Sequence, residues 1–262
     1  MENEKRAKYL LIDEQGLTKY GIENGYYPDL KTVWADGQGD LMIADRDQAM
    51  ELRNQNAIVR YEDGGYYILN PYDQRYELAS SEDLETKFVD NEMEAVRHIL
   101  QMLGAKSIEL EKIELTNSDN SYSGNGSLKW MKQGLDLSVD YEKCMKDRIF
   151  QQITFYDPQN EVRDLSQIEY EMERKGLISN SYLSNCLNDL KATQKPLTQN
   201  VRMKFKCLNE VKKGLEIGAK LSVLKLKMSV DYQQKSEETH VFVTTLKVCF
   251  GQASETARKA LM

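Results

Sequence analysis

The most constraining feature of the sequence is a long run of alternating apolar and polar residues near its C-terminal end. Apolar side chains occupy every second position from Leu224 to Tyr232, and they share one face again from Phe242 onward. Alternation with a period of two is typical of a β-strand that buries one face and exposes the other. The sequence therefore predicts one long β-hairpin over residues 221–250, with residues 233–238 as its polar turn.

A second hairpin is predicted earlier in the chain, from Trp130–Tyr141 and Ile149–Tyr156. Its segment Leu137–Tyr141 differs from Met228–Tyr232 only in the first residue. Short β patterns recur whenever two hairpins meet the same steric demands, so this similarity has two interpretations, an internal duplication or an independent recurrence. A pair of helices at about residues 164–193 is inserted between the two hairpins.

A further strand is predicted between the insert and the long hairpin. Residues 201–207 alternate between apolar and basic side chains, which gives the strand one basic side. Together with two lysines of the hairpin, this side would form a patch able to bind phosphate groups of a lipid or a nucleic acid. The competing interpretation, which the pattern favours, is a solvated sheet face whose lysines discourage pairing at the edge. The residues of the patch are Arg202, Lys204, Lys206, Lys225 and Lys227.

The N-terminal part contains shorter strands, predicted at Tyr9–Ile12 and at Leu41–Ile43. A hairpin is predicted over residues 58–69, because Asp63-Gly64 readily adopts the positive φ values of a type I′ turn and places Tyr61 opposite Tyr66. Tyrosines gather around this hairpin and would form either an aromatic binding surface or a cross-strand aromatic core, of which the core is favoured. The candidate surface residues are Tyr61, Tyr66, Tyr67 and Tyr72.

Helices are indicated by apolar residues at helical spacing and by capping residues at their ends. Gly104 is a suitable stop for the longest of them. In the strand predicted after Gly104, the apolar residues pass from one face of the strand to the other, which predicts a β-bulge near Glu111-Lys112. The predicted helices are Asp45–Leu52, Glu82–Leu103, a helix opened by the capping box Ser166–Glu169 and ended by Gly176, and Ser181–Ala192.

These elements predict an α+β fold with two modules. The first, residues 1–103, is an acidic α/β module that ends in the long helix; it carries 21 acidic and 11 basic side chains. The second, residues 104–262, is a larger antiparallel β-sheet module with the inserted helical pair, and it is net basic although the whole chain has a net charge of −7. The uneven charge has three interpretations: the two modules attract each other, the basic face meets an anionic partner, or the charge only keeps the protein in solution, which is the favoured one.

Cysteine usage and hydropathy bear on the cellular compartment. The four cysteines are widely spaced and form no CxxC pair, so free thiols in a reducing compartment are expected. No run of apolar residues is long enough for a signal peptide or a membrane-spanning helix. A cytoplasmic location is therefore expected.

Candidates for chemistry are few. The two histidines, His98 and His240, have no nucleophile or metal ligand at a suitable spacing. The acidic stretch Asp36–Asp47 lacks the glycine and the final glutamate of a calcium-binding EF-hand loop. No catalytic residue, metal site or cofactor is predicted. The sequence does not decide whether the protein is an enzyme, and the expectation is that it is not.

The leading interpretation is a non-enzymatic interaction protein that binds through sheet faces and edges. A protein partner is expected first; self-association, and an anionic lipid or nucleic acid at the basic patch, are the alternatives for the partner. One alternative function is a latent membrane-acting or pore-forming protein, because both hairpins are long enough to cross a bilayer as β-strands. The other is a hydrolase or nuclease whose carboxylates converge only in space.

Overall fold

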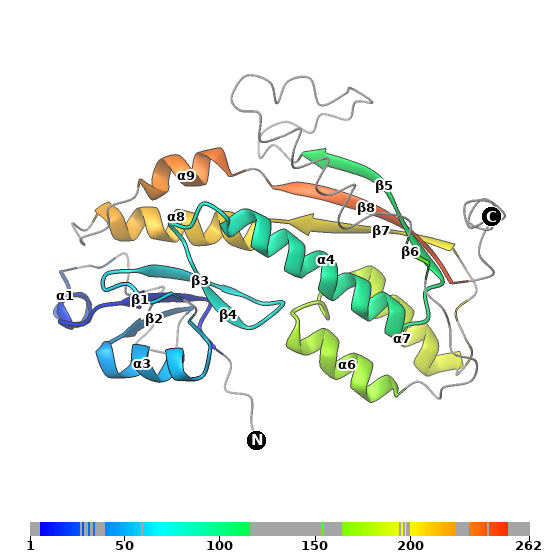
Figure 1. Cartoon of the computed structure of the whole chain (residues 1–262), viewed down its shortest axis with the longest axis horizontal. Coiled ribbons are helices and arrows are strands. Elements are labelled where there is room, and N and C mark those ends of the chain that lie inside the picture. The colour runs from blue at the N-terminus through cyan, green and yellow to red at the C-terminus, as the bar shows by residue number, and fades with distance from the viewer. Residues whose placement is uncertain are drawn as a thin grey trace. The chain divides into compact units, whose positions relative to one another are not determined.

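The computed structural model describes residues 6–26, 28, 31, 34, 40–58, 60–115, 153–154, 164–193, 195, 197, 200–223, 231–239 and 241–250. Within these residues the chain forms seven helices and two β-sheets, and each sheet contains antiparallel pairs (Figure 1). The predicted α+β class is confirmed.

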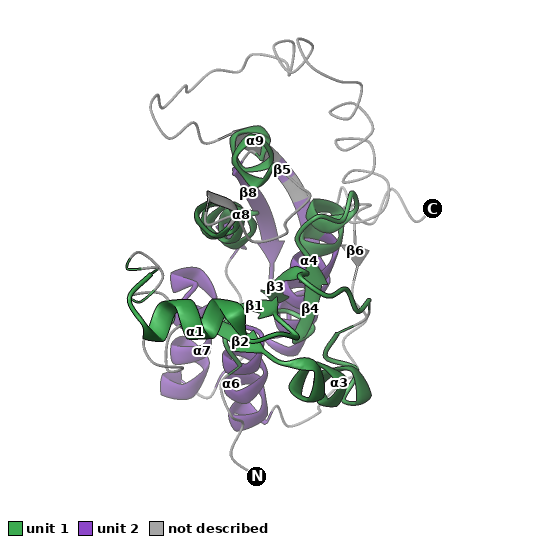
Figure 2. Cartoon of the chain, turned by 90° about the vertical axis from the view of Figure 1, so that its left-hand side faces the viewer, with its two compact units in different colours: residues 1–89, 208–240 green, residues 90–207, 241–262 purple. Residues whose placement is uncertain are grey.

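The chain divides into two compact units, and each unit is assembled from two separate stretches (Figure 2). Unit 1 contains Met1–Val89 and Leu208–His240, and unit 2 contains Asp90–Cys207 and Val241–Met262. The first boundary falls inside helix α4 (Leu84–Met102). The bounds of the compact units differ from those of the modules 1–103 and 104–262, and the division into these modules stays a prediction.

Unit 1 is built on a four-stranded mixed sheet with the strand order β2-β1-β3-β4. Strand β1 pairs in parallel with β2 and antiparallel with β3, and β3 forms a hairpin with β4. The predicted strands at residues 9–12 and 41–43 are confirmed. The bounds are Tyr9–Ile12 for β1, Leu41–Ala44 for β2, Tyr66–Asn70 for β3 and Arg75–Leu78 for β4.

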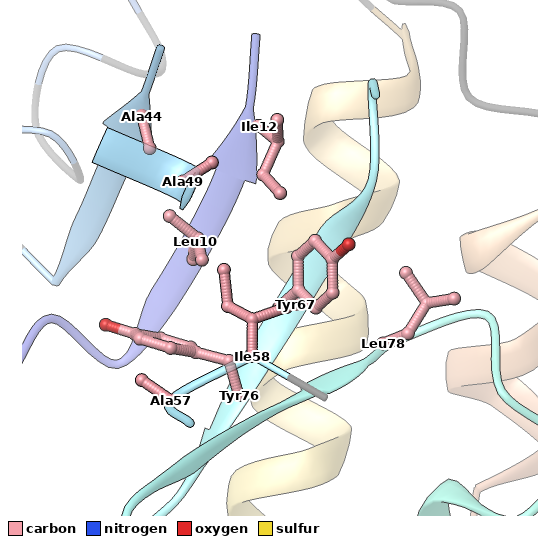
Figure 3. Close-up of a cluster of buried hydrophobic side chains, with 9 residues drawn as sticks. All are labelled: Leu10, Ile12, Ala44, Ala49, Ala57, Ile58, Tyr67, Tyr76 and Leu78. Atoms are coloured by element: carbon pink, nitrogen blue, oxygen red, sulfur yellow. The ribbon is translucent and has the colours of Figure 1, made fainter. Parts of the chain in front are cut away.

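Helices cover both faces of this sheet, which explains why all four residues of β1 are apolar and buried. In Figure 1, α3 (Arg46–Asn54) lies on one side of the strands and α8 (Asn209–Val223) lies on the other. Helix α3 begins at the predicted cap, since the Asp45 side chain accepts a hydrogen bond from the Gln48 backbone N–H at 2.9 Å. The side chains on the α3 side form one apolar cluster (Figure 3): Leu10, Ile12, Ala44, Ala49, Ala57, Ile58, Tyr67, Tyr76 and Leu78.

Helix α8 contacts β3 through two glycines that lie one turn apart. A Cβ atom on Gly214 would lie 2.6 Å from Cδ1 of Ile68, and one on Gly218 would lie 2.9 Å from Cε1 of Tyr66. The Tyr66 hydroxyl donates a hydrogen bond to the Gly214 carbonyl at 2.8 Å. Because only a residue without a Cβ leaves room for Ile68 and Tyr66, these glycines set how closely α8 approaches the sheet.

Helix α9 (Tyr232–Glu238) packs against α8, and the Tyr232 ring meets the Tyr66 ring edge to face. Lys235 fastens the helix to the turn after β4, because its Nζ donates to the Ala79 and Ser81 carbonyls at 2.7 and 2.8 Å. The Thr239 hydroxyl, just beyond α9, also donates to the Glu85 carboxylate at 2.7 Å.

The predicted hairpin over residues 221–250 is wrong where the structure describes its first arm and its turn. Residues 221–223 end α8, and residues 233–238 form α9 instead of a polar turn. The Asp231 side chain caps α9 by accepting from the Gln234 N–H at 3.0 Å, and pairs of Gln and Glu four residues apart support it. The returning strand is confirmed as β8 (Phe242–Cys249), while residues 224–230 lie outside the described residues.

The predicted hairpin over residues 58–69 is also corrected. The turn at Asp63-Gly64 forms, with a φ of 72° at Gly64, and the strand after it forms as β3. However, β3 pairs with β1 and β4, so Tyr61 does not lie opposite Tyr66. The reason is long-range: β1 offers an apolar strand buried on both faces, which a local hairpin could not match.

Unit 2 is built on an antiparallel sheet with the strand order β6-β5-β8-β7. The bounds are Ser107–Leu115 for β5, Ile153–Thr154 for β6 and Asn200–Cys207 for β7. The predicted bulge is confirmed, because the register between β5 and β8 shifts between Leu110 and Lys112. The hairpin predicted over residues 130–156 lies outside the described residues except for β6.

Two further helices lie on one side of this sheet in Figure 1, α6 (Leu165–Arg174) and α7 (Ser181–Thr193). Both were predicted, but the predicted capping box at Ser166 is wrong. The cap of α6 is Asp164, whose carboxylate accepts from the Ser166 and Gln167 N–H groups. The remaining helix, α1 (Leu17–Glu23), follows β1 in unit 1.

We expect Gly214→Ala and Gly218→Ala each to lower the free energy of unfolding by about 1–2 kcal/mol, because overpacking against β3 outweighs the gain in helix propensity. Chemical denaturation measures this. The control Glu216→Ala, on the exposed face of α8, should change stability by less than about 0.5 kcal/mol. Glycine-to-alanine changes usually stabilise an exposed helix. A higher free energy of unfolding in either variant would therefore contradict the close packing of α8 against β3.

Leu208 links β7 to α8 and adopts a φ of 64°, which is unfavourable for a bulky side chain. Leu208→Gly and Leu208→Ala both remove the buried side chain, but only glycine tolerates this φ without strain. We therefore expect the glycine variant to be the more stable of the two by about 1 kcal/mol, the reverse of the order at an ordinary position. Thermal unfolding of the two variants side by side decides the order.

Candidate binding surface

Strand β7 has one buried side and one exposed side. Met203, Phe205 and Cys207 point into unit 2 and are buried, whereas the alternate residues are exposed. The exposed residues Arg202, Lys204 and Lys206 therefore share one face, as the alternation predicted. We call the face of β7 and β8 that carries these three cations and Lys247 the outward face; Lys225 and Lys227 lie outside the described residues.

The register of the sheet gives each of these cations a neighbour on β8. Arg202 lies beside Lys247, Lys204 beside Thr245, and Lys206 beside Val243. Side chains directly opposite on neighbouring strands lie close enough to interact, so none of the three cations gains an acidic partner from β8.

One of the three cations is nevertheless neutralised by a carboxylate two strands away. Nε and an Nη atom of Arg202 donate to the two oxygens of Glu111 at 2.7 and 2.6 Å, which is a bidentate ion pair. The Glu111 carboxylate raises the pKa of the Arg202 guanidinium. Glu111 is the residue that the bulge of β5 leaves without a partner on β8, and sequence reasoning located the bulge without assigning Glu111 a role. A longer contact of 3.7 Å joins Lys247 to Glu109.

Lys204 and Lys206 differ from Arg202, because neither forms an ion pair with a carboxylate in the described part of the chain. Next to them, the side chain of Asn180 occupies part of the outer edge of β7. Its Nδ2 donates to the Lys204 carbonyl at 3.3 Å, while its Oδ1 accepts from the first N–H groups of α7. A lysine-bearing edge with a capped carbonyl is poorly suited to accept another strand, so the outward face is the accessible part of β7.

The four candidate tyrosines do not form one exposed surface. Tyr66 and Tyr67 are fully buried, which corrects their assignment to a binding surface and fits the alternative of an aromatic core. The Tyr67 hydroxyl accepts from the Glu62 N–H and donates to the Arg60 carbonyl, both at 2.9 Å, and burial raises its pKa to about 12. Tyr61 and Tyr72 are partly exposed, and the Tyr61 hydroxyl donates to Glu14.

A buried polar cluster lies on the other side of β7. The Cys207 sulfur lies 3.6 Å from the Thr244 hydroxyl, and a hydrogen bond joins the thiol to Glu92 of α4. Burial, and then Glu92, raise the pKa of the Cys207 thiol well above its ordinary value. Sequence reasoning missed Glu92, although its position between Phe88 and Val96, each four residues away, places a carboxylate within the apolar stripe of α4.

Other kinds of site find no support in the part of the chain that the structure describes. No three His, Cys, Asp or Glu side chains gather there as a metal-binding group. His98 is exposed on α4, and His240 lies outside the described residues. None of the described helices is both long and apolar enough to cross a membrane.

We expect the Cys207 thiol of the folded protein to resist alkylation by iodoacetamide at pH 8, because its raised pKa leaves little thiolate and its burial excludes the reagent. Mass spectrometry of the peptide that contains Cys207 measures the labelling, with the same reaction in guanidinium chloride as the control. Equally fast labelling of the folded and denatured protein would contradict the buried cluster.

Comparisons with protein-family models, with curated proteins and with solved structures find no match to this chain. The residues of the outward face are therefore the basis on which a function is inferred.

Proposed function

We propose that this chain is a cytosolic, non-enzymatic binding protein that recognises an acidic segment of a partner protein with the outward face. The observation that carries the proposal is the pair Lys204 and Lys206. Both ammonium groups lie on the exposed side of one strand, two residues apart, with no carboxylate partner among the described residues. Two carboxylates of an extended or helical segment would complement them.

The surroundings of β7 favour a ligand that contacts the side chains of the outward face over one that pairs as an added strand with the edge of β7. Asn180 already binds the Lys204 carbonyl, so a new strand would have to displace this hydrogen bond. Lysines at alternate positions also repel a second basic edge, which disfavours pairing between two copies of β7. The same lysines attract an acidic ligand that approaches the outward face.

The number of unpaired cations among the described residues of the outward face favours an acidic protein segment over a nucleic acid or a lipid surface. Proteins that bind duplex DNA through its backbone contact roughly 6–10 phosphates, and anionic membranes are recognised by clusters of about 4–8 basic residues. On the outward face Glu109 and Glu111 lie beside Lys247 and Arg202, so carboxylates interrupt the positive charge. A short acidic segment needs only a few cations.

The cysteines support the cytosolic part of the proposal. Cys186 and Cys207 carry free thiols, and burial also raises the pKa of Cys186 to about 11. Free thiols persist in a reducing compartment such as the cytosol.

We expect the double variant Lys204→Glu/Lys206→Glu to bind fluorescein-labelled octaglutamate at least about tenfold more weakly than the wild type, because two attractions become two repulsions. Fluorescence anisotropy at low salt measures the affinity, and added salt should weaken wild-type binding. Lys19→Glu/Lys220→Glu is the control, since it makes the same change of net charge at exposed residues elsewhere.

The proposal fails if the test and control variants lose affinity equally, or if the wild type binds octaglutamine as well as octaglutamate. A single-stranded oligonucleotide and vesicles that contain phosphatidylserine are tested in parallel. Tighter binding of either probe than of octaglutamate, with the same dependence on Lys204 and Lys206, would overturn the choice of an acidic protein segment.

A further inference from the structure

The bulge in β5 places a carboxylate where the outward face would otherwise offer a third free cation. The register passes from Leu110 opposite Leu246 to Lys112 opposite Thr245, so Glu111 is the extra residue. Bulges re-aim a side chain relative to the regular strand. Here the re-aimed side chain reaches past β8 to Arg202 on β7.

The contact between the two side chains has the geometry with which arginine recognises any carboxylate. Both oxygens of Glu111 are engaged, at 2.6 and 2.7 Å, by two nitrogens of the planar guanidinium. A second ion pair of this face, Lys247 with Glu109, is longer at 3.7 Å and involves a single nitrogen. Arg202 thus binds the carboxylate of Glu111 with the geometry expected for the carboxylate of a ligand.

The pair is also accessible and replaceable. The side chain of Arg202 is 71% exposed and that of Glu111 is 34% exposed, so both groups remain in contact with solvent. Ion pairs at such exposed positions contribute little to stability, because water competes for both charges. A carboxylate of a ligand held by Lys204 and Lys206 would reach Arg202 at a high effective concentration and compete with Glu111.

We propose that Glu111 is an internal competitor for the acidic ligand: it occupies Arg202 in the free protein and gives way when the ligand binds. This inference rests on the proposed function. In the bound form the ligand is held by three cations at two-residue intervals along β7, Arg202, Lys204 and Lys206. In the free protein the same face is partly self-neutralised, which weakens binding of ligands with too few carboxylates.

Removing the internal competitor should therefore strengthen binding. We expect Glu111→Gln to bind octaglutamate about threefold to fivefold more tightly than the wild type in the anisotropy assay described above. Glu109→Gln is the matched control, because it removes one negative charge from the same strand and the same face. It should change the affinity by less than about twofold, since its lysine partner is not part of the β7 row.

A second background shows whether the effect passes through Arg202. In the Arg202→Gln background, adding Glu111→Gln should raise the affinity for octaglutamate no more than adding Glu109→Gln does. Circular dichroism confirms that each variant is folded, and all the substituted side chains are exposed or partly exposed.

The outcomes separate the inference from the proposed function. Equal gains from Glu111→Gln and Glu109→Gln, or a loss of affinity in Glu111→Gln, would overturn the role of Glu111. If Lys204→Glu/Lys206→Glu still weakens binding in that case, the proposed function stands. If neither lysine matters, both the proposed function and the inference are overturned.

Discussion

The approach of α8 to β3 is the contact on which unit 1 depends. Without side chains on Gly214 and Gly218, the helix backbone comes close enough for Ile68 and Tyr66 to pack directly against it. The Tyr66 hydroxyl then satisfies the Gly214 carbonyl, which keeps a polar group inside an apolar contact from being unpaired. This contact buries Ile68 and Tyr66 on the second face of the sheet, and cover on both faces explains why β1 is apolar throughout.

The parts of the fold that could be predicted from the sequence are those with local signals. Strands β1 and β2 and helices α3, α4 and α7 carry local signals, namely apolar spacing and capping residues, and they were predicted. Helix α8 was missed because its buried stripe is made partly of glycines, which weaken helix propensity and carry no apolar signal. Its neighbour α9 was assigned to a turn because the alternating residues before it suggested a hairpin.

For the candidate surface, the sequence predicted the strand and its exposed cations but not their electrostatic state. The alternation in residues 201–207 places Arg202, Lys204 and Lys206 on one side, which the structure confirms. The partner of Arg202 is separated from it by 91 positions in the chain and by one intervening strand. The bulge was predicted from the change of phase in the apolar residues, but the register that brings Glu111 across β8 to Arg202 cannot be derived from local patterns.

The assembly of unit 1 from two distant stretches has a consequence for the order of events during synthesis. Tyr66 and Gly214 are separated by 148 positions, so a ribosome needs roughly 7–30 s to add the second after the first. Throughout that interval the N-terminal strands have no α8 to cover Tyr66 and Ile68, and the emerging chain carries an apolar sheet face in contact with solvent. An apolar face that stays uncovered for this long is a site where a chaperone would bind the nascent chain.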